Sequence, residues 1–291
     1  MLQSIATKAV RWVPRALTGR CMGRLAGSRA SKLAVRPFAA AFGIDLEEAE
    51  HGPDEYPTLA AFFTRRLRQG ARPVDPCPGV LVSPVDGILS DCGRIEQGTA
   101  PLVKGTRLSF AELLGPSRAA PFMSGGFSVH YLSPRDYHWI HAPHEGRVTA
   151  WAHVPGDFYP VFPRSLDEFG CVFTKNERVI TFMETSLGHL AVAKVAAMGV
   201  GNISLAYAAV SHDAGRIQSH THFTQLVPLL LRTSVRRWRS RLGYHPSTHS
   251  YANGYYSHGS RSRWLPNWAG IWHRSLGWLC LVSSGDRKRT S

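Results

Sequence analysis

The sequence predicts an α+β fold, with a mainly antiparallel β core of the sandwich or barrel-like type and amphipathic helices at its N-terminus. Two patterns lead to this class. Apolar residues recur at near-helical spacing at the start of the chain. From about residue 80 to 207, short runs rich in Val, Ile, Phe and Leu are cut every eight to twelve residues by Gly, Pro, Asp or Asn. Because long helical periods are missing from that stretch, strands joined by turns are expected.

Length and composition bound the possible functions. At 291 residues the chain can hold one large domain or two small ones. Its five scattered cysteines form no CxxC pair, which argues against a disulfide framework or a structural zinc site. The net charge of +14 is uneven, because residues 211–291 hold 12 Lys and Arg against two acids. The composition therefore changes near residue 210.

The N-terminal segment is basic and amphipathic. No acid precedes Asp45, Pro14 interrupts the helical pattern, and the apolar positions are Leu2, Ile5, Ala6, Val10, Val13 and Leu17. Such a segment can lie in the interface of an anionic membrane, and it also has the composition of a mitochondrial transit peptide. A pair of ordinary surface helices is the third interpretation. No apolar run reaches membrane-spanning length, so any membrane contact is expected to be peripheral.

A short helix is expected next. Leu59, Phe62, Phe63 and Leu67 recur at the spacing of one buried helix face, and Thr58 can cap its N-terminus. Gly70 and Pro73 would end it.

The following body should consist of strands. The runs that predict them are residues 80–82, 87–89, 127–131, 146–151, 179–182 and 190–195.

The stretch from Tyr131 to Pro143 carries His138 and His141 between two prolines. We expect a tight turn, in which one helical turn would bring both imidazoles to the same side. Histidine titrates near neutral pH, so the pair is a candidate for proton transfer. A metal site would need further ligands. In the purely structural alternative, one histidine caps the turn and the other packs.

Asp86 lies in the turn sequence Ser83-Pro-Val-Asp-Gly87. Asp-Gly is an ordinary hairpin signal. The functional alternative makes Asp86 the carboxylate that orients a histidine and stabilises its charged form.

Seven motifs follow one another along the chain: FFTRRLRQGARP, SPVDG, VKG with ELLG, GGF, YLSPRDYHWIHAP, NERVI and GVGNI. Their order closely resembles the phosphatidylserine decarboxylase family over about residues 40 to 207. The resemblance implies three regions: membrane-associating helices over 1–50, a catalytic body over 51–207 and an atypical basic segment, rich in Trp, Arg and Ser, over 208–291.

The resemblance also implies a proenzyme that makes its own pyruvoyl cofactor. Decarboxylation of an amino acid leaves a carbanion, and a pyruvoyl carbonyl bound to the substrate amine is an electron sink for it. In this family an internal serine attacks the preceding carbonyl, and the chain separates into a β chain and a pyruvoyl-bearing α chain. Asp86 and His141 would activate that serine, and His138 would act near the substrate carboxylate.

The implied substrate is phosphatidylserine in an anionic membrane, which is converted to phosphatidylethanolamine and carbon dioxide. The protein would be peripheral on a bacterial cytoplasmic membrane, or on the mitochondrial inner membrane if the N-terminus is a transit peptide.

The C-terminal segment departs from the family pattern. The family's serine lies in a Leu-Gly-Ser-Thr motif followed by an apolar strand, and no such motif occurs here. Gly259-Ser260 is the nearest dipeptide, but Arg261 and Arg263 follow it, and charges are costly to bury in a strand. Ser260 is therefore a weak candidate. The strand pattern and glutamate are also lost, which suggests a replaced or frame-shifted segment.

Smaller departures from the family are Trp139, where arginine is usual, and Phe162, where asparagine is usual. Two alternatives remain at this stage. One is an inactive family member that only binds a membrane surface. The other is nucleic-acid binding by the basic, Trp-rich tail, although no nucleic-acid motif accompanies it.

Overall fold

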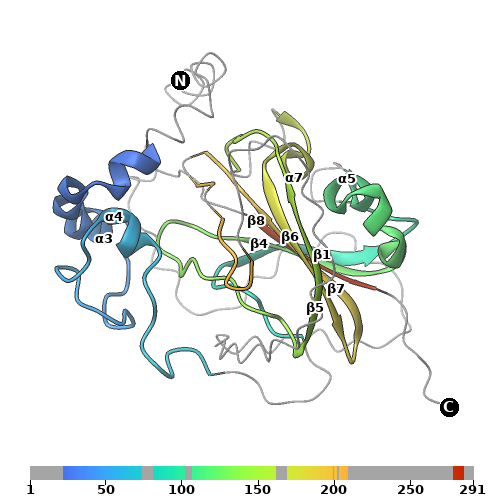
Figure 1. Cartoon of the computed structure of the whole chain (residues 1–291), viewed down its shortest axis with the longest axis horizontal. Helices are drawn as coiled ribbons and strands as arrows, with labels where there is room; N and C mark the ends of the chain where they lie inside the picture. The colour runs from blue at the N-terminus through green and yellow to red at the C-terminus, as the bar shows by residue number, and fades with distance from the viewer. Residues whose placement is uncertain are drawn as a thin grey trace, which may run out of the picture.

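We describe the protein from a computed structural model that covers residues 22–73, 81–101, 107–161, 169–198, 200–201, 203–208 and 278–284. Figure 1 shows N-terminal helices on one side of the molecule and a β-sheet on the other. The helical elements of the N-terminal part are η1 (Arg29–Ala34), α3 (Val35–Phe42) and α4 (Leu59–Phe63). Residues 22–27 are also helical.

The main sheet has six strands in the order β1-β4-β8-β7-β6-β5, and every neighbouring pair is antiparallel. The strands are β1 (Ile88–Ile95), β4 (Gly125–Tyr131), β5 (Gly146–Val154), β6 (Arg178–Thr185), β7 (Gly188–Val195) and β8 (Trp278–Ser284). A separate two-stranded sheet pairs β2 (Thr99–Pro101) with β3 (Arg107–Ser109). The α+β class with a mainly antiparallel core is thus confirmed. The main sheet is open, with β1 and β5 at its edges, and does not close into a barrel.

Strand β8 was not expected from the sequence. The segment after residue 210 was expected to lack strands, yet β8 lies between β4 and β7 in the middle of the sheet. Its register joins both neighbours over its length, with Trp278 opposite Tyr131 and Val195. The apolar run that forms β8 is short and isolated in a polar segment, so composition averaged over that segment hides it.

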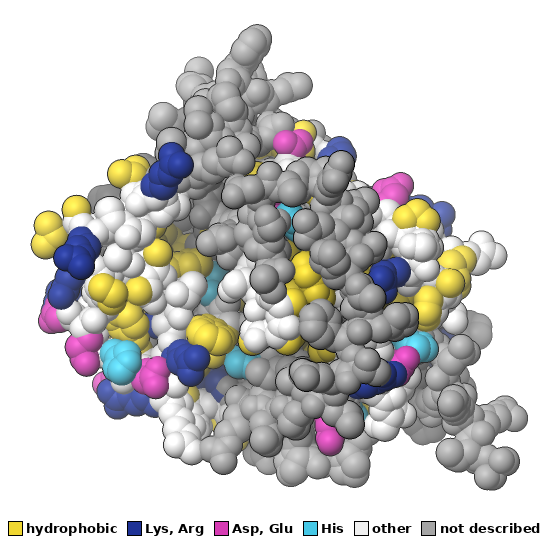
Figure 2. Space-filling view, viewed as in Figure 1, with side chains coloured by type: hydrophobic (Ala, Val, Ile, Leu, Met, Phe, Trp, Pro, Cys, Tyr) yellow, Lys and Arg dark blue, Asp and Glu magenta, His cyan; other side chains and the backbone are white. Residues whose placement is uncertain are grey.

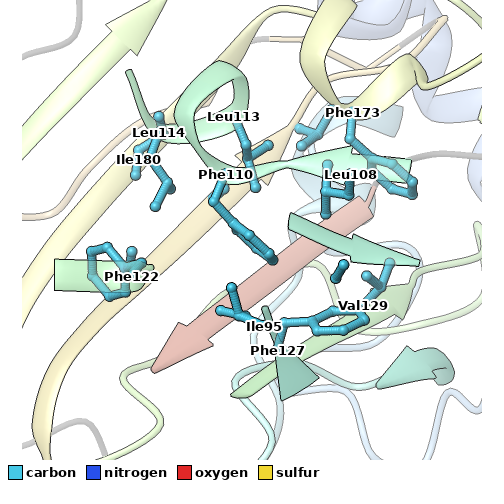
Figure 3. Close-up of a cluster of buried hydrophobic side chains, with 14 of the residues drawn as sticks. Ile95, Leu108, Phe110, Leu113, Leu114, Phe122, Phe127, Val129, Phe173 and Ile180 are labelled. Carbon is cyan, nitrogen blue, oxygen red and sulfur yellow. The ribbon is translucent and has the colours of Figure 1, made fainter. Parts of the chain in front are cut away.

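One face of the sheet carries the main hydrophobic core. Short helical elements cover this face: α5 (Phe110–Leu114), η2 (Pro116–Arg118), η3 (Ala120–Phe122) and α7 (Val172–Lys175). Figure 3 shows Phe110, Phe122, Phe127 and Ile180 within this cluster. The Arg178 guanidinium, buried beneath α5, donates to the carbonyls of Glu112 and Leu113. The ELLG and NERVI motifs are therefore tied together structurally.

The N-terminal helices form a second core around Val35, Tyr56 and Phe62. Helix α4 begins as expected, since the Thr58 hydroxyl accepts a hydrogen bond from the Ala61 N–H at 3.0 Å. It ends at Phe63, earlier than expected. Leu67 instead bridges to Ala49 as an isolated β pair, because the chain after the helix turns back along residues 48–50.

Most of the remaining predicted strands are present. The exception is the run at residues 80–82, of which 81 and 82 form no strand. Leu81 and Val85 lie on the other face of the sheet, where Leu132, Ile140 and Val192 complete a smaller cluster. That face carries the candidate site.

Candidate active site

Three segments that are far apart in the sequence meet at one end of the sheet. Strand β1 begins at Ile88, β4 ends at Tyr131 and β8 begins at Trp278. The register sets Tyr131 opposite both Ile88 and Trp278. The turn that carries Asp86, the loop that carries both histidines and the start of β8 are therefore neighbours.

The two loops are held to one another by backbone hydrogen bonds. The N–H of Val82 donates to Pro143 O at 2.8 Å, and the N–H of His141 donates to Pro84 O at 2.9 Å. The side chains of Val85 and Leu132 are buried together beneath them. This pairing brings the SPVDG turn beside His141.

The histidine loop begins with a turn closed by Asp136. Its carboxylate accepts from the Ser133 N–H at 2.6 Å and from the Ser133 hydroxyl at 2.8 Å. The Asp136 N–H donates back to Ser133 O at 3.0 Å. Both histidines follow this turn in a segment that is neither helix nor strand, so the expected helical turn that would align them is wrong.

His138 is fixed in one tautomer. Its Nδ1 lies 2.8 Å from the carbonyl oxygen of Asp136, and because a carbonyl only accepts, Nδ1 carries the proton. The Nε2 atom is buried and has no hydrogen-bond partner. Burial lowers the pKa of His138 to about 4. At neutral pH the ring is uncharged and Nε2 has a free lone pair.

His141 has a different environment. Its ring stacks on Tyr137 with centroids 5.6 Å apart, and its Nε2 lies 3.2 Å from the Tyr137 hydroxyl. The Nδ1 atom is buried without a partner. Burial lowers the pKa of His141, and the negative charge of Asp86 opposes that shift. Asp86 therefore acts on His141 through its charge.

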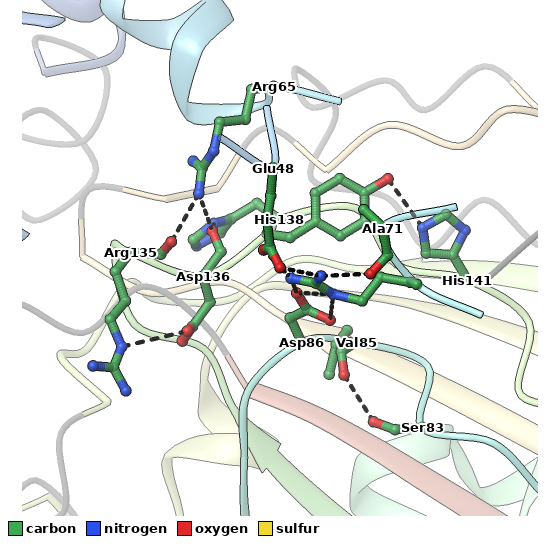
Figure 4. A network of polar contacts seen from close by, with 12 residues as sticks. Glu48, Arg65, Ala71, Ser83, Val85, Asp86, Arg135, Asp136, His138 and His141 are labelled. Carbon is green, nitrogen blue, oxygen red and sulfur yellow. Dashed lines mark hydrogen bonds and ion pairs between the residues drawn. The ribbon is translucent and has the colours of Figure 1, made fainter. Parts of the chain in front are cut away.

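The hydrogen bonds of Asp86 go to Arg72. The Arg72 Nε and Nη2 atoms donate to Asp86 Oδ2 at 2.8 and 2.7 Å, and the same guanidinium binds both carboxylate oxygens of Glu48 at 2.8 and 2.6 Å. Figure 4 shows the rings of His138 and His141 on opposite sides of this network. Asp86 is therefore hydrogen-bonded to a permanent cation and affects His141 only through its charge.

Helix α4 and the residues after it position the histidine loop. The Phe63 ring packs on His138 with centroids 4.0 Å apart, and the Trp139 indole N–H donates to Thr64 O at 2.8 Å. The Arg66 guanidinium lies over the Trp139 ring at 4.7 Å. The N-terminal helices are thus part of the site's support.

Of the residues predicted for the site, Asp86 and His141 are not joined by a hydrogen bond and interact only through the charge of Asp86, and Figure 4 shows His138 on the other side of the Arg72 network from His141. Ser260 lies outside the described residues, as does the VKG motif. Sequence reasoning missed Glu48, Arg72 and Tyr137 as site residues. Arg72 belongs to the basic motif FFTRRLRQGARP, and that membership was the one available signal.

Comparison with known proteins gives one consistent result. The family model for phosphatidylserine decarboxylase matches residues 59–236, which is more than half of the chain. The chain belongs to the phosphatidylserine decarboxylase family.

Individual relatives agree with this assignment. The phosphatidylserine decarboxylase proenzyme of Myxococcus xanthus is 47% identical over 184 residues, which cover 63% of this chain and 66% of that protein. The proenzyme of Brevibacillus brevis is 40% identical, with 67% of this chain and 71% of that protein covered. The chain thus spans about two thirds of the length of these relatives. Their family is one of carboxy-lyases named as proenzymes.

Hydrogen bonding distinguishes the motif residues that serve the fold from the candidate catalytic residues. Asn176 of NERVI is buried, and its side-chain amide bonds the backbone of Tyr159 and Ala196 at 2.8 to 2.9 Å. With both its oxygen and its nitrogen satisfied, Asn176 serves the fold. The Nε2 atom of His138 and the Nδ1 atom of His141, by contrast, have no hydrogen-bond partner.

Lys194 on β7 is a further buried group of the decarboxylase body. Burial lowers the pKa of its ammonium to about 7. Its Nζ donates to the Thr181 hydroxyl at 2.5 Å, and Thr181 in turn bonds the Tyr207 hydroxyl. This residue follows Val192 by two positions on the same strand, so it faces the side of the sheet that carries the site.

Proposed function

We propose that this chain is a phosphatidylserine decarboxylase proenzyme that converts phosphatidylserine to phosphatidylethanolamine and carbon dioxide through a self-generated pyruvoyl group. The observation that carries the proposal is the pair of buried nitrogens without partners, His138 Nε2 and His141 Nδ1, on the loop that leaves β4 at the end of the sheet where β8 begins. In the family, the chain before an apolar strand supplies the serine. The orphaned atoms fit a site that acquires a reacting group there.

The proposed roles follow from the proton states. The pyruvoyl carbonyl supplies an electron sink for the carbon that loses carbon dioxide. His141 takes a proton from the attacking hydroxyl, and the Asp86 carboxylate stabilises the resulting imidazolium. His138, neutral and with its Nε2 lone pair free, handles a proton near the substrate carboxylate. Arg72 holds the Asp86 carboxylate by hydrogen bonds from its Nε and Nη2 atoms and limits its rotation.

The N-terminal helices support a peripheral membrane location. Leu25 and Leu33 are 69% and 85% exposed, which is unusual for leucine, and the basic residues Arg24, Arg29 and Lys32 lie in the same segment. Figure 2 shows exposed apolar side chains beside Lys and Arg on this part of the surface. This composition suits an anionic bilayer that carries the lipid substrate. Within the described part of the chain, no helix has the length and apolarity needed to cross a bilayer.

A denaturing gel combined with intact mass measurement tests the proposal. A working proenzyme yields two fragments, and the mass of the C-terminal one reports the pyruvoyl end. The His141→Ala variant should remain uncleaved because the hydroxyl loses its base. Processing that continues unchanged in this variant contradicts the role assigned to His141.

A specific observation favours a second candidate function, that of an inactive family member that binds the membrane surface. The family places its serine directly before an apolar strand. Here Leu276 and Gly277 precede β8, and Trp278 stands where Leu-Gly is followed by serine in the family. The Gly259-Ser260 dipeptide lies further from the strand.

The Trp278→Ser variant discriminates between the two candidates. If the body is competent and only the serine is missing, the wild type stays a single band and the variant is cleaved between residues 277 and 278. If another serine supplies the pyruvoyl group, the wild type is already cleaved. An uncleaved variant with an uncleaved wild type excludes both forms of self-processing.

A further inference from the structure

Arg65 is a buried cation with unused hydrogen-bonding capacity. Its residue is only 3% exposed. Its Nη2 atom donates to Arg135 O at 2.7 Å and to Asp136 O at 3.3 Å. The Nε and Nη1 atoms are buried and have no hydrogen-bond partner. Because a guanidinium carries five N–H donors, three of them remain without an acceptor.

The carboxylates near Arg65 are engaged by other groups. Asp136, Asp86 and Glu48 act on Arg65 only through their charge. The Asp136 carboxylate closes the turn with Ser133, and those of Asp86 and Glu48 bind Arg72. Among the described residues, none of these acids supplies an oxygen to Arg65. Burying a cation and several donors without such a partner is costly.

The His138 ring lies next to this guanidinium. Both side chains bond the same acceptor, the carbonyl oxygen of Asp136. The positive charge of Arg65 contributes to the low pKa of His138, which confirms that the two are close. Figure 4 shows the guanidinium and the imidazole beside each other, reaching in from α4's end and from the loop. His138 Nε2 is also without a partner.

We propose that Arg65 is the anion-binding residue of the site and receives an oxyanion of the substrate headgroup, with the free Nε2 of His138 beside that anion. The inference rests on the proposed function and adds a binding residue to it. An oxyanion would accept from the Nε and Nη1 hydrogens, and charge-assisted bonds of this kind are the strong ones. The oxyanion is the serine carboxylate or the phosphodiester, since both have this chemistry.

A purely structural role for Arg65 accounts for less of the geometry. The carbonyls of Arg135 and Asp136 occupy a single nitrogen, and the guanidinium also lies over the Phe62 ring at 5.3 Å, but neither contact gives the Nε and Nη1 hydrogens an acceptor. The neighbouring Arg66 supports the same loop by stacking on Trp139 from an exposed position, with no buried unpartnered nitrogen. Arg66 is therefore the matched control.

Binding can be measured on the full chain by NMR of the arginine Nε–H groups. The probes are N-acetylated glycerophosphoserine and N-acetylated glycerophosphoethanolamine, whose blocked amines cannot react with a carbonyl group, together with inorganic phosphate. A shift of the Arg65 signal with the serine probe alone identifies the carboxylate. Equal shifts with all three probes identify the phosphate.

The variants separate binding from folding. Arg65→Met should weaken binding of the effective probe about tenfold or more, and Arg65→Lys should recover part of it, because it keeps the charge with fewer donors. Arg66→Met should bind within about twofold of the wild type. If Arg65→Met does not fold, the wild-type signal still decides the question.

The inference is overturned if no probe shifts the Arg65 signal at tens of millimolar, or if Arg65→Met folds and binds as the wild type does. This outcome is distinct from failure of the proposed function, because the probes need neither self-cleavage nor turnover. A chain that stays uncleaved on a gel can still bind the oxyanion at Arg65.

Discussion

Burial decides the protonation of individual side chains in this protein. His130 on β4 and His138 in the site loop both have their pKa lowered to about 4, in each case mainly by burial. Their positions differ, since His130 bonds the Ser128 hydroxyl at 2.9 Å within the sheet and His138 bonds a loop carbonyl. The protonation of His130 affects stability alone, whereas the protonation of His138 affects both stability and the chemistry of the site.

The lowered pKa values predict acid sensitivity. Between about pH 6.5 and pH 4 the unfolded chain binds a proton at each histidine that the folded chain does not, so the free energy of unfolding falls as pH falls. The slope is up to about 1.4 kcal/mol per pH unit for each group. His130→Leu should reduce this dependence of the free energy of unfolding on pH, as measured by urea titrations at several pH values. A slope in His130→Leu equal to that of the wild type would contradict the role of burial.

A second residue-scale prediction concerns Arg72, which is 8% exposed at its side chain and binds two carboxylates. Arg72→Met leaves both Glu48 and Asp86 without their cation. We expect a loss of about 2 to 3 kcal/mol in the free energy of unfolding, reduced from the cost of a fully buried pair because Glu48 is partly exposed.

Chemical denaturation measures the loss at Arg72, and Glu48→Gln provides a milder comparison because one ion pair remains. The Arg72→Met variant has a second readout, which is the pKa of His141. With Asp86 no longer neutralised, the His141 pKa should rise, which NMR titration detects. An unchanged denaturation midpoint and an unchanged His141 pKa would together show that the network is unimportant.

At the scale of elements, strand β8 determines how the site is assembled. It separates β4, which leads into the histidine loop, from β7, which carries Lys194. Its first residue lies opposite Tyr131, so β8 begins at the end of the sheet where the loops meet. Helix α4 acts from the other side, where Phe63 and Arg65 contact the loop.

The register of β8 predicts a specific cross-link. Ala193 on β7 lies opposite Cys280, and directly paired residues of antiparallel strands have Cα separations that a disulfide can span. Ala193→Cys should therefore form a disulfide with Cys280 under mild oxidation, detectable by peptide mass mapping. Ala191→Cys, which is opposite Val282, is the matched control. Equal cross-linking in both variants would contradict the register.

At the scale of the whole molecule, the chain's C-terminal part completes a sheet begun by its middle. Without β8 the sheet would divide into β1-β4 on one side and β7-β6-β5 on the other. The main core includes residues from both parts, such as Phe127 of β4 and Ile180 of β6. The two sides of the site, on β1-β4 and on β7-β6-β5, therefore depend on β8. This strand lies outside the region that the family model matches.

This dependence predicts the effect of truncation. A chain that ends at residue 208 should fail to fold cooperatively, because two inner strand edges and part of the core lose their partner. A chain that ends at Ser284 keeps every described strand and should unfold as the full chain does. Circular dichroism melts and NMR dispersion compare them. A cooperative melt for the shorter chain would show that β8 is dispensable.

The sequence by itself determined the fold class, the capped start of α4, most of the strands and the three residues Asp86, His138 and His141. These features depend on local patterns, namely periodicity, turn chemistry and residue types that suit proton transfer. The family motifs gave the same residues their expected roles, which the experiments above test.

Only the tertiary structure decided the partners of those residues. Asp86 binds Arg72, which also binds Glu48, and Arg65 reaches the histidine loop from 70 residues earlier in the chain. Strand β8 takes the centre of the sheet although its surroundings in the sequence carry no strand pattern. The physical reason is that hydrogen bonds, ion pairs and strand pairing depend on distance in space. A local pattern specifies how a segment folds, but not which distant segment satisfies it.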